Sequence, residues 1–216
     1  MALAAVALLV GVVAGVWLPP SLLAVRVVLV VVWGLAAAAI WIVSAPSRPP
    51  LMLFGRPPAG WMRVTFLDVG QADATLVQAP DGRSLLVDAG GSLSARSAIG
   101  SRVVVPALWA LGVRRLDVAA LTHGDPDHIG GMGAVLGDFA PREVWEGVPV
   151  PDYPPLDAVR RVADAVGARW RRVAAGDRFD LGGVSIKVVH PPPPDWERIR
   201  VRNDDSIVID VRFGNV

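Results

Sequence analysis

Residues 121–132 read LTHGDPDHIGGM, and this stretch places four side chains of metal-binding type within six positions. These side chains are His123, Asp125, Asp127 and His128. The apolar run LDVAAL at 116–121 comes directly before them and predicts a buried strand, so the four donors follow a strand end. Neighbouring side chains diverge, and the arrangement therefore suits two ions better than one. We expect His123 and Asp125 to bind one ion, and Asp127 and His128 to bind the other.

A pair of divalent ions would give this loop a hydrolytic chemistry. Two-metal sites generate hydroxide near neutral pH and hold both oxygens of a displaced phosphate or acyl group. Gly130 and Gly131 follow the donors, and their lack of side chains would let the next helix begin close beneath the ions. The alternative is that Asp127 is only a helix N-cap and that both histidines are ordinary polar loop residues. Four such residues together favour the metal site.

Charge and hydropathy divide the chain into two parts. Residues 1–43 contain one charged side chain, Arg26, and no acidic residue precedes Asp68. The apolar runs 2–18 and 22–43 predict two transmembrane helices, although the first run is marginally short for a bilayer. A signal peptide and a buried helical hairpin are the alternative interpretations of these runs.

The remainder of the chain predicts a linker and one globular domain. Residues 44–60 are rich in proline and glycine and oppose a regular helix. Residues 61–216 carry eighteen basic and twenty acidic side chains, a formal charge of −2 that indicates no strongly basic face for nucleic acid. The chain has no cysteine, which excludes disulfides and thiolate metal sites, so nitrogen and oxygen must supply the ligands.

Hydrophobic periodicity in the domain predicts short strands with helices between them, an α/β or α+β fold. The expected strands are 62–67, 74–78, 84–87, 116–121, 143–145, 169–173, 184–189 and 206–213. The expected helices are 99–111 with a break near Pro106, 129–137 and 156–166.

The motif HGDPDH resembles the HxHxDH signature of the metallo-β-lactamase fold, with aspartate in place of the second histidine. Together with FLDVGQADA at 66–74 and LLVDAGG at 85–91, it resembles the C-terminal hydrolase domain of ComEC-type DNA-uptake channel proteins. This resemblance extends from about residue 61 to the end of the chain. It implies an αβ/βα sandwich with the metals at one edge, preceded by transmembrane helices.

The resemblance also assigns roles to residues around the loop. It implies that His123, Asp125, Asp127 and His128 are metal ligands, and that Asp127 also orients the attacking water. Three acidic residues are expected to lie behind the ligands and support them: Asp68, Asp73 and Asp88. The alternatives are that Asp68 and Asp73 only anchor their loop or form simple Asx turns, and that Asp88 is a turn residue at a strand end. Aspartate at position 125 favours harder cations, so we expect two divalent ions, manganese or zinc.

Two further segments match the family less closely. Residues 203–206 (NDDS) are expected to form a hydrogen-bonding segment at the site edge, and His190 is expected to be structural. The family pattern continues with a bridging aspartate and a last histidine, whereas this chain has no histidine after His190. We therefore expect a truncated fragment, incomplete at its C-terminus, that binds metal weakly and does not turn over.

Three functions follow from these observations. The first is a membrane-tethered phosphodiesterase acting on single-stranded DNA during uptake, with other competence proteins and the rest of its own channel as partners. The second is a hydrolase of the same fold acting on another ester or a lactam, and the third is a non-catalytic channel domain that steers DNA. Arg48 and Arg56 would by the positive-inside tendency place the linker in the cytoplasm, whereas the resemblance implies an extracytoplasmic domain on an integral membrane protein.

Overall fold

The computed structural model describes residues 57–91, 98–193 and 197–215, together with isolated positions between 21 and 55. By its internal contacts the chain divides into two compact units, Met1–Pro50 and Leu51–Val216. The predicted transmembrane helices at 2–18 and 22–43 lie outside the described residues, apart from isolated positions in the second. Within the described part of the chain, no helix has the length and hydropathy needed to cross a bilayer.

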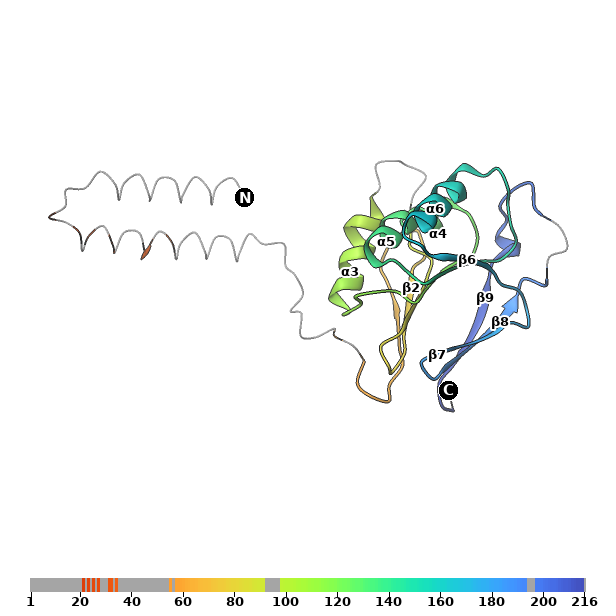
Figure 1. Cartoon of the computed structure of the whole chain (residues 1–216), viewed down its shortest axis with the longest axis horizontal. Helices are drawn as coiled ribbons and strands as arrows, with labels where there is room; N and C mark the ends of the chain where they lie inside the picture. The colour runs from red at the N-terminus through yellow and green to blue at the C-terminus, as the bar shows by residue number, and fades with distance from the viewer. Residues whose placement is uncertain are drawn as a thin grey trace. The chain divides into compact units, whose positions relative to one another are not determined.

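The second unit is built on a six-stranded mixed sheet whose strands follow one another in chain order (Figure 1). Its strands are β1 (Arg63–Phe66), β2 (Thr75–Gln78), β3 (Ser84–Val87), β4 (Val118–Leu121), β5 (Glu143–Glu146) and β6 (Arg169–Arg172). The first three strands pair antiparallel, and β3 to β6 pair parallel. All four residues of β4 are buried, as expected for a central parallel strand that is covered on both faces.

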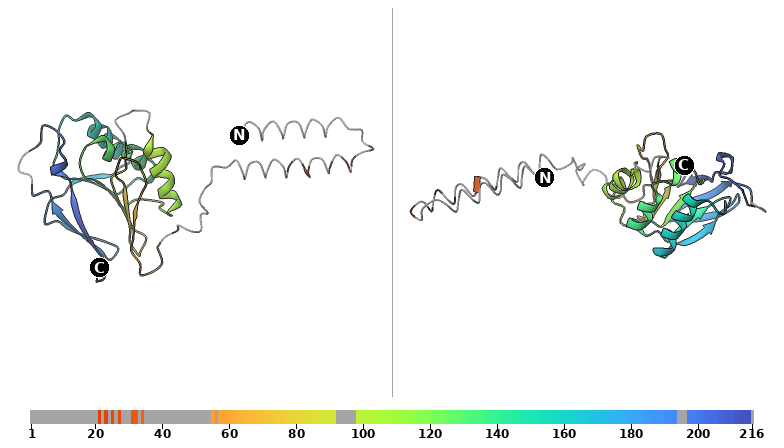
Figure 2. Two further views of the ribbon diagram at one scale, coloured as in Figure 1. Left: turned by 180° about the vertical axis from the view of Figure 1, so that it is seen from behind. Right: turned by 90° about the horizontal axis from the view of Figure 1, so that it is seen from above.

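Helices in the parallel crossovers cover one face of this sheet (Figures 1 and 2). They are the π-helical turn η2 (Gly100–Val104), α3 (Val105–Ala110), α4 (Pro126–Ile129), α5 (Met132–Phe139) and α6 (Pro154–Ala165). Leu108, Leu136 and Val159 from these helices join Leu86 and Ala119 of the sheet in one buried apolar cluster. Burial of such side chains is the main stabilising contribution to this layer.

A three-stranded antiparallel sheet packs on the opposite face. It consists of β7 (Arg178–Leu181), β8 (Val184–His190) and β9 (Val208–Arg212), and the short 3-10 helix η3 (Asn203–Asp205) precedes β9. Ile186 and Val188 of β8 meet Leu85 and Trp145 of the first sheet in a second buried cluster. The described residues thus form three layers of the expected αβ/βα sandwich (Figure 2). Buried residues of β8 alternate with exposed or half-buried ones, so one face of this strand is turned to solvent.

The smaller sheet leaves the edge strand β1 partly uncovered. Val64 pairs with Val77, so its side chain lies on the face that the second sheet covers elsewhere. It is nevertheless 41% exposed, and Phe66, two residues further along the same face, is 80% exposed. The second sheet therefore does not reach the β1 edge within the described residues.

All eight predicted strands are present, and three predictions about the elements need correction. Strand β7 was not predicted, because two of its four residues are charged and it lies between Gly176 and Gly182-Gly183, which are typical of turns. The predicted helix 129–137 is two helices, α4 and α5, separated at Gly130 and Gly131. The helix at 99–111 does not stop near Pro106; it changes from η2 to α3 there, and Pro106 lies in the first turn of α3, where no amide donor is needed.

Candidate metal centre

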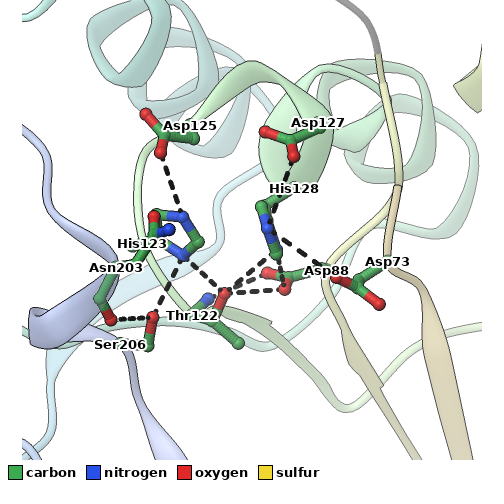
Figure 3. Close-up of polar contacts among 9 residues, drawn as sticks. All are labelled: Asp73, Asp88, Thr122, His123, Asp125, Asp127, His128, Asn203 and Ser206. Carbon is green, nitrogen blue, oxygen red and sulfur yellow. Dashed lines mark hydrogen bonds and ion pairs between the residues drawn. The ribbon is translucent and has the colours of Figure 1, made fainter. Parts of the chain in front are cut away.

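The candidate site lies at the carboxyl ends of the parallel strands β3 and β4 (Figure 3). Asp88 follows β3, Thr122 and His123 follow β4, and the loop then enters α4 at Pro126. In parallel sheets this edge is where ligands usually bind, because several loops converge on it. The strands therefore place residues from separate segments around one point.

Asp88 joins the two strand ends. It is 2% exposed and has a positive φ of 57°, a conformation that aspartate tolerates better than most residues. Its Oδ1 accepts the amide of Thr122 at 2.8 Å, and its Oδ2 accepts the Thr122 hydroxyl and His128 Nδ1, each at 2.7 Å. A buried carboxylate with three charge-assisted hydrogen bonds holds the start of the ligand loop in place. Asp88 was expected to support this loop.

The first half-site consists of His123 and Asp125. The Nε2 atom of His123 lies 3.2 Å from Asp125 Oδ2, but the alignment does not satisfy a hydrogen bond, and this buried nitrogen has no hydrogen-bond partner. Buried polar atoms without a partner are rare, because each costs about 1–3 kcal/mol. A cation shared by the nitrogen and the carboxylate would satisfy both groups.

The second half-site consists of His128, Asp127 and Asp73. His128 Nε2 lies 3.7 Å from Asp127 Oδ2 and 3.7 Å from Asp73 Oδ2. The carboxylates of Asp127 and Asp73 are half-exposed and mostly exposed, so they stand at the mouth of the site. The rings of His123 and His128 have centroids 4.1 Å apart, which brings the two half-sites side by side.

The donors lie as two neighbouring histidine–carboxylate groups. As the described side chains stand, no three of them are arranged to hold a metal ion. Each half-site offers one imidazole nitrogen and carboxylate oxygens within a few ångströms of one another. Nitrogen and oxygen donors of this kind suit manganese or zinc.

His128 has a raised pKa. The hydrogen bond to Asp88 is the largest cause, burial opposes it, and the negative charges of Asp88, Asp127 and Asp73 raise the pKa further. Three carboxylates facing one imidazole favour its cationic form. The same negative field would attract a divalent cation, which competes with the proton for Nε2.

The three acidic residues predicted behind the ligands have different positions. Asp88 holds the loop as described above, whereas Asp73 faces His128 Nε2 directly and stands among the candidate ligands. Asp68 is exposed, and its carboxylate accepts the amide of Gly70 at 3.3 Å within its own loop. The described contacts do not bring Asp68 to the centre, so the structure gives it the role of a turn residue.

Two hydroxyl residues complete the centre and were not predicted individually. Thr122 Oγ1 lies 3.1 Å from His123 Nδ1, and Ser206 Oγ lies 3.2 Å from the same atom (Figure 3). Ser206 belongs to the segment 203–206 that was predicted to line the site edge. His190, predicted to be structural, donates from Nδ1 to the Ser206 carbonyl at 2.8 Å.

The two glycines after the ligands have a packing role. A Cβ added to Gly131 would lie 2.1 Å from the carbonyl oxygen of Ala89, and one added to Gly91 would lie 2.7 Å from Gly130 Cα. Gly131 also donates its amide to Gly90 O at 2.8 Å. The glycines therefore bring the helices against the loop that follows β3, and the ligand loop stays close to Asp88 for that reason.

Comparison with known proteins supports the same reading of this domain. The family model described as "Metallo-beta-lactamase superfamily" matches residues 67–209. ComE operon protein 3 of Bacillus subtilis (strain 168) is 29% identical over 164 residues, which cover 71% of this chain and 21% of that protein. Competence protein ComA of Neisseria gonorrhoeae is 46% identical over 72 residues, 33% of this chain and 10% of that protein. The chain thus spans about a fifth of the first relative's length and a tenth of the second's.

Solved structures are similar at a lower level of identity. The Zn²⁺-bound PqqB from Methylobacterium extorquens is 18% identical, with a TM-score of 0.41, and the match covers 66% of this chain and 49% of that one.

Proposed function

Because the chain belongs to the metallo-beta-lactamase superfamily, a superfamily of metal-dependent hydrolases, we propose that it contributes to the hydrolysis of phosphodiester bonds in DNA during uptake. The observation that carries this proposal is the buried Nε2 of His123, which has no hydrogen-bond partner and faces the Asp125 carboxylate at 3.2 Å. An acid–imidazole pair of this kind beside a second one is the arrangement that a two-metal hydrolytic site needs.

Two divalent cations, manganese or zinc, would be held by His123 and Asp125 on one side and by His128, Asp127 and Asp73 on the other. When bound, they would supply a hydroxide near neutral pH and neutralise charge on the phosphate. Asp127 stands half-exposed at the mouth, where its carboxylate can accept a hydrogen bond from the attacking water and hold it in line. Asp88 keeps His128 oriented through the bond to Nδ1, so Nε2 points to the mouth.

The DNA substrate is proposed from the relatives. Two proteins similar to this chain are named ComE operon protein 3 and Competence protein ComA. A superfamily fold does not fix the substrate, so this step depends on those similarities rather than on the geometry of the centre. Single-stranded DNA is the substrate that we propose, with other uptake proteins and the remainder of a channel as partners.

The location is part of the same proposal. The apolar runs at 2–18 and 22–43 would anchor the chain in the cell membrane, with the hydrolase domain on the extracytoplasmic side. Such an anchor would hold the metal centre beside DNA as it enters.

A cleavage assay tests the function. The protein as the cell makes it, purified in detergent and loaded with Mn²⁺ or Zn²⁺, is expected to cut an end-labelled single-stranded oligonucleotide and to lose that activity with a chelator. Asp127→Ala is expected to lower the rate by at least about 100-fold, on the scale of a lost proton-transfer or water-orienting group. Asp138→Ala, an exposed aspartate of α5, is the matched control and is expected to keep the wild-type rate. Equal cleavage by the Asp127 and Asp138 variants would overturn the proposal, as would the absence of cleavage with either metal.

A further inference from the structure

The Nδ1 atom of His123 lies between two hydroxyl groups that come from different sheets. Thr122 Oγ1, at the end of β4, is 3.1 Å away, and Ser206 Oγ, next to η3, is 3.2 Å away (Figure 3). Ser206 is 83 positions from His123 in the chain. The pairing therefore exists only because the second sheet packs against the first.

Each hydroxyl has already committed its single proton elsewhere. Ser206 donates to the carbonyl oxygen of Asn203 at 2.6 Å, and Thr122 donates to the Asp88 carboxylate at 2.7 Å. Carbonyl and carboxylate oxygens only accept, and a hydroxyl has one proton to give. Both hydroxyls can then interact with His123 only as acceptors, so Nδ1 must carry the hydrogen.

The hydrogen on Nδ1 determines the state of the opposite nitrogen. In a neutral imidazole one nitrogen is protonated and the other has a lone pair. With the hydrogen on Nδ1, the lone pair is on Nε2, the buried atom that has no hydrogen-bond partner and faces Asp125 Oδ2 at 3.2 Å. A lone pair directed toward a carboxylate is stabilised by a cation between them.

We propose that Ser206 is a positioning residue that fixes His123 in the Nδ1–H tautomer and thereby makes Nε2 available to a divalent cation. The inference rests on the proposed function in treating His123 as a metal ligand. It adds that the tautomer of His123 is fixed by a residue that lies just before β9 of the second sheet, whereas Asp88, which follows β3 of the first sheet, orients His128.

Three contacts hold the Ser206 hydroxyl in its position. Asp205 forms two bonds with the guanidinium group of Arg198, at 2.7 and 2.8 Å, and these secure η3. Ile207 donates its amide to the carbonyl of Thr122 at 2.9 Å, which fastens the start of β9 to the end of β4. His190 donates to the Ser206 carbonyl. The state of His123 is therefore coupled to the packing of the two sheets.

Histidine-selective ¹⁵N labelling gives a direct test, since the whole chain has only three histidines. The ring nitrogens of His123 are assigned by comparison with His128→Gln and His190→Gln variants of the full chain. The spectra are recorded in detergent, without metal, at a pH high enough for the imidazole rings to be neutral. The wild type is expected to show His123 with a protonated Nδ1. Ser206→Ala is expected to raise the Nε2–H population and to weaken Mn²⁺ binding by about tenfold, the lower range for losing a group behind a metal ligand.

Two further variants separate positioning from a general structural effect. Ser206→Thr keeps the hydroxyl and is expected to restore both the tautomer and the Mn²⁺ affinity. Ser185→Ala removes an exposed hydroxyl from the same sheet and is expected to change neither. Ser206→Ala with an unchanged tautomer population would overturn the inference. If the tautomer shifts in Ser206→Ala but no variant binds Mn²⁺, the role of Ser206 stands and the proposed metal function fails.

Discussion

Replacing Gly131 by alanine tests the packing that holds the ligand loop against the first sheet. The added Cβ would lie 2.1 Å from the carbonyl oxygen of Ala89 and 2.9 Å from Gly100 Cα, both backbone atoms. Gly131 has φ −86° and ψ −13°, which alanine adopts easily, so the expected cost is steric alone. Relief to an ordinary contact needs about 1.3 Å of backbone displacement, and overpacking on this scale costs about 1–3 kcal/mol or more.

Gly133 supplies a control two residues further along. A Cβ added there meets no atom within 4 Å, and the residue lies inside α5. Gly133→Ala is therefore expected to stabilise the protein by up to about 1 kcal/mol through helix propensity. The two alanine variants should differ by about 1–4 kcal/mol in free energy of unfolding, since one is destabilised and the other stabilised.

Urea denaturation of both variants and the wild type, followed by circular dichroism, measures this difference. The Gly131→Ala protein is also expected to bind Mn²⁺ more weakly, since the displacement moves His128 away from Asp88. Unfolding of Gly131→Ala and Gly133→Ala at the same urea concentration would show that the close contact between Gly131 and the loop after β3 does not position this site.

Further predictions concern the buried charges. Asp88→Asn is expected to lower the free energy of unfolding by about 2–4 kcal/mol, because three bonds to a buried carboxylate are disturbed, and to weaken Mn²⁺ binding by about 10- to 100-fold in a dialysis measurement. The raised pKa of His128 predicts extra stability of the metal-free protein below pH 6.5, and this stability is lost as the pH rises through the higher folded-state pKa. Urea denaturation across this pH range should show that loss of stability in the wild type and little of it in Asp88→Asn. Mn²⁺ affinity is expected to follow the opposite trend and to fall as His128 becomes protonated, and a flat pH profile would contradict this. Glu146→Ala is expected to cost about 1–3 kcal/mol, since it removes the buried acceptor of Arg160 at 2.6 Å and of Trp170 at 2.9 Å, whereas Glu197→Ala at an exposed pair should stay within about 0.5 kcal/mol by the same unfolding assay.

Most of the fold could be predicted from local patterns. The strand at 116–121 was recognisable as a short apolar run, and the helix at 156–166 because its apolar residues repeat with the period of a helix. The break between α4 and α5 could not be found in this way, because it depends on how closely Gly131 approaches Ala89. Strand β7 was missed because its sequence RFDL is half charged and is bounded by turn glycines.

The candidate site was predictable to a similar extent. The grouping of His123, Asp125, Asp127 and His128 into two pairs follows from their spacing, and the structure brings each histidine within 3.7 Å of a carboxylate as expected. The direct approach of Asp73 to His128 was not predicted, because a loop before β2 reaches the site only after β1 to β4 have assembled.

The sequence by itself determined which donors share one loop and that a buried strand delivers them, since these properties depend on residues a few positions apart. Only the tertiary structure decided that Nε2 of each imidazole faces the carboxylates of Asp125, Asp127 and Asp73, while Nδ1 is turned to other partners. That choice depends on Asp88 and Ser206, which come from different sheets and lie 40 and 83 positions from the histidines they contact. Hydrogen bonds over such separations form only when the sheets pack, because packing fixes the position of both partners.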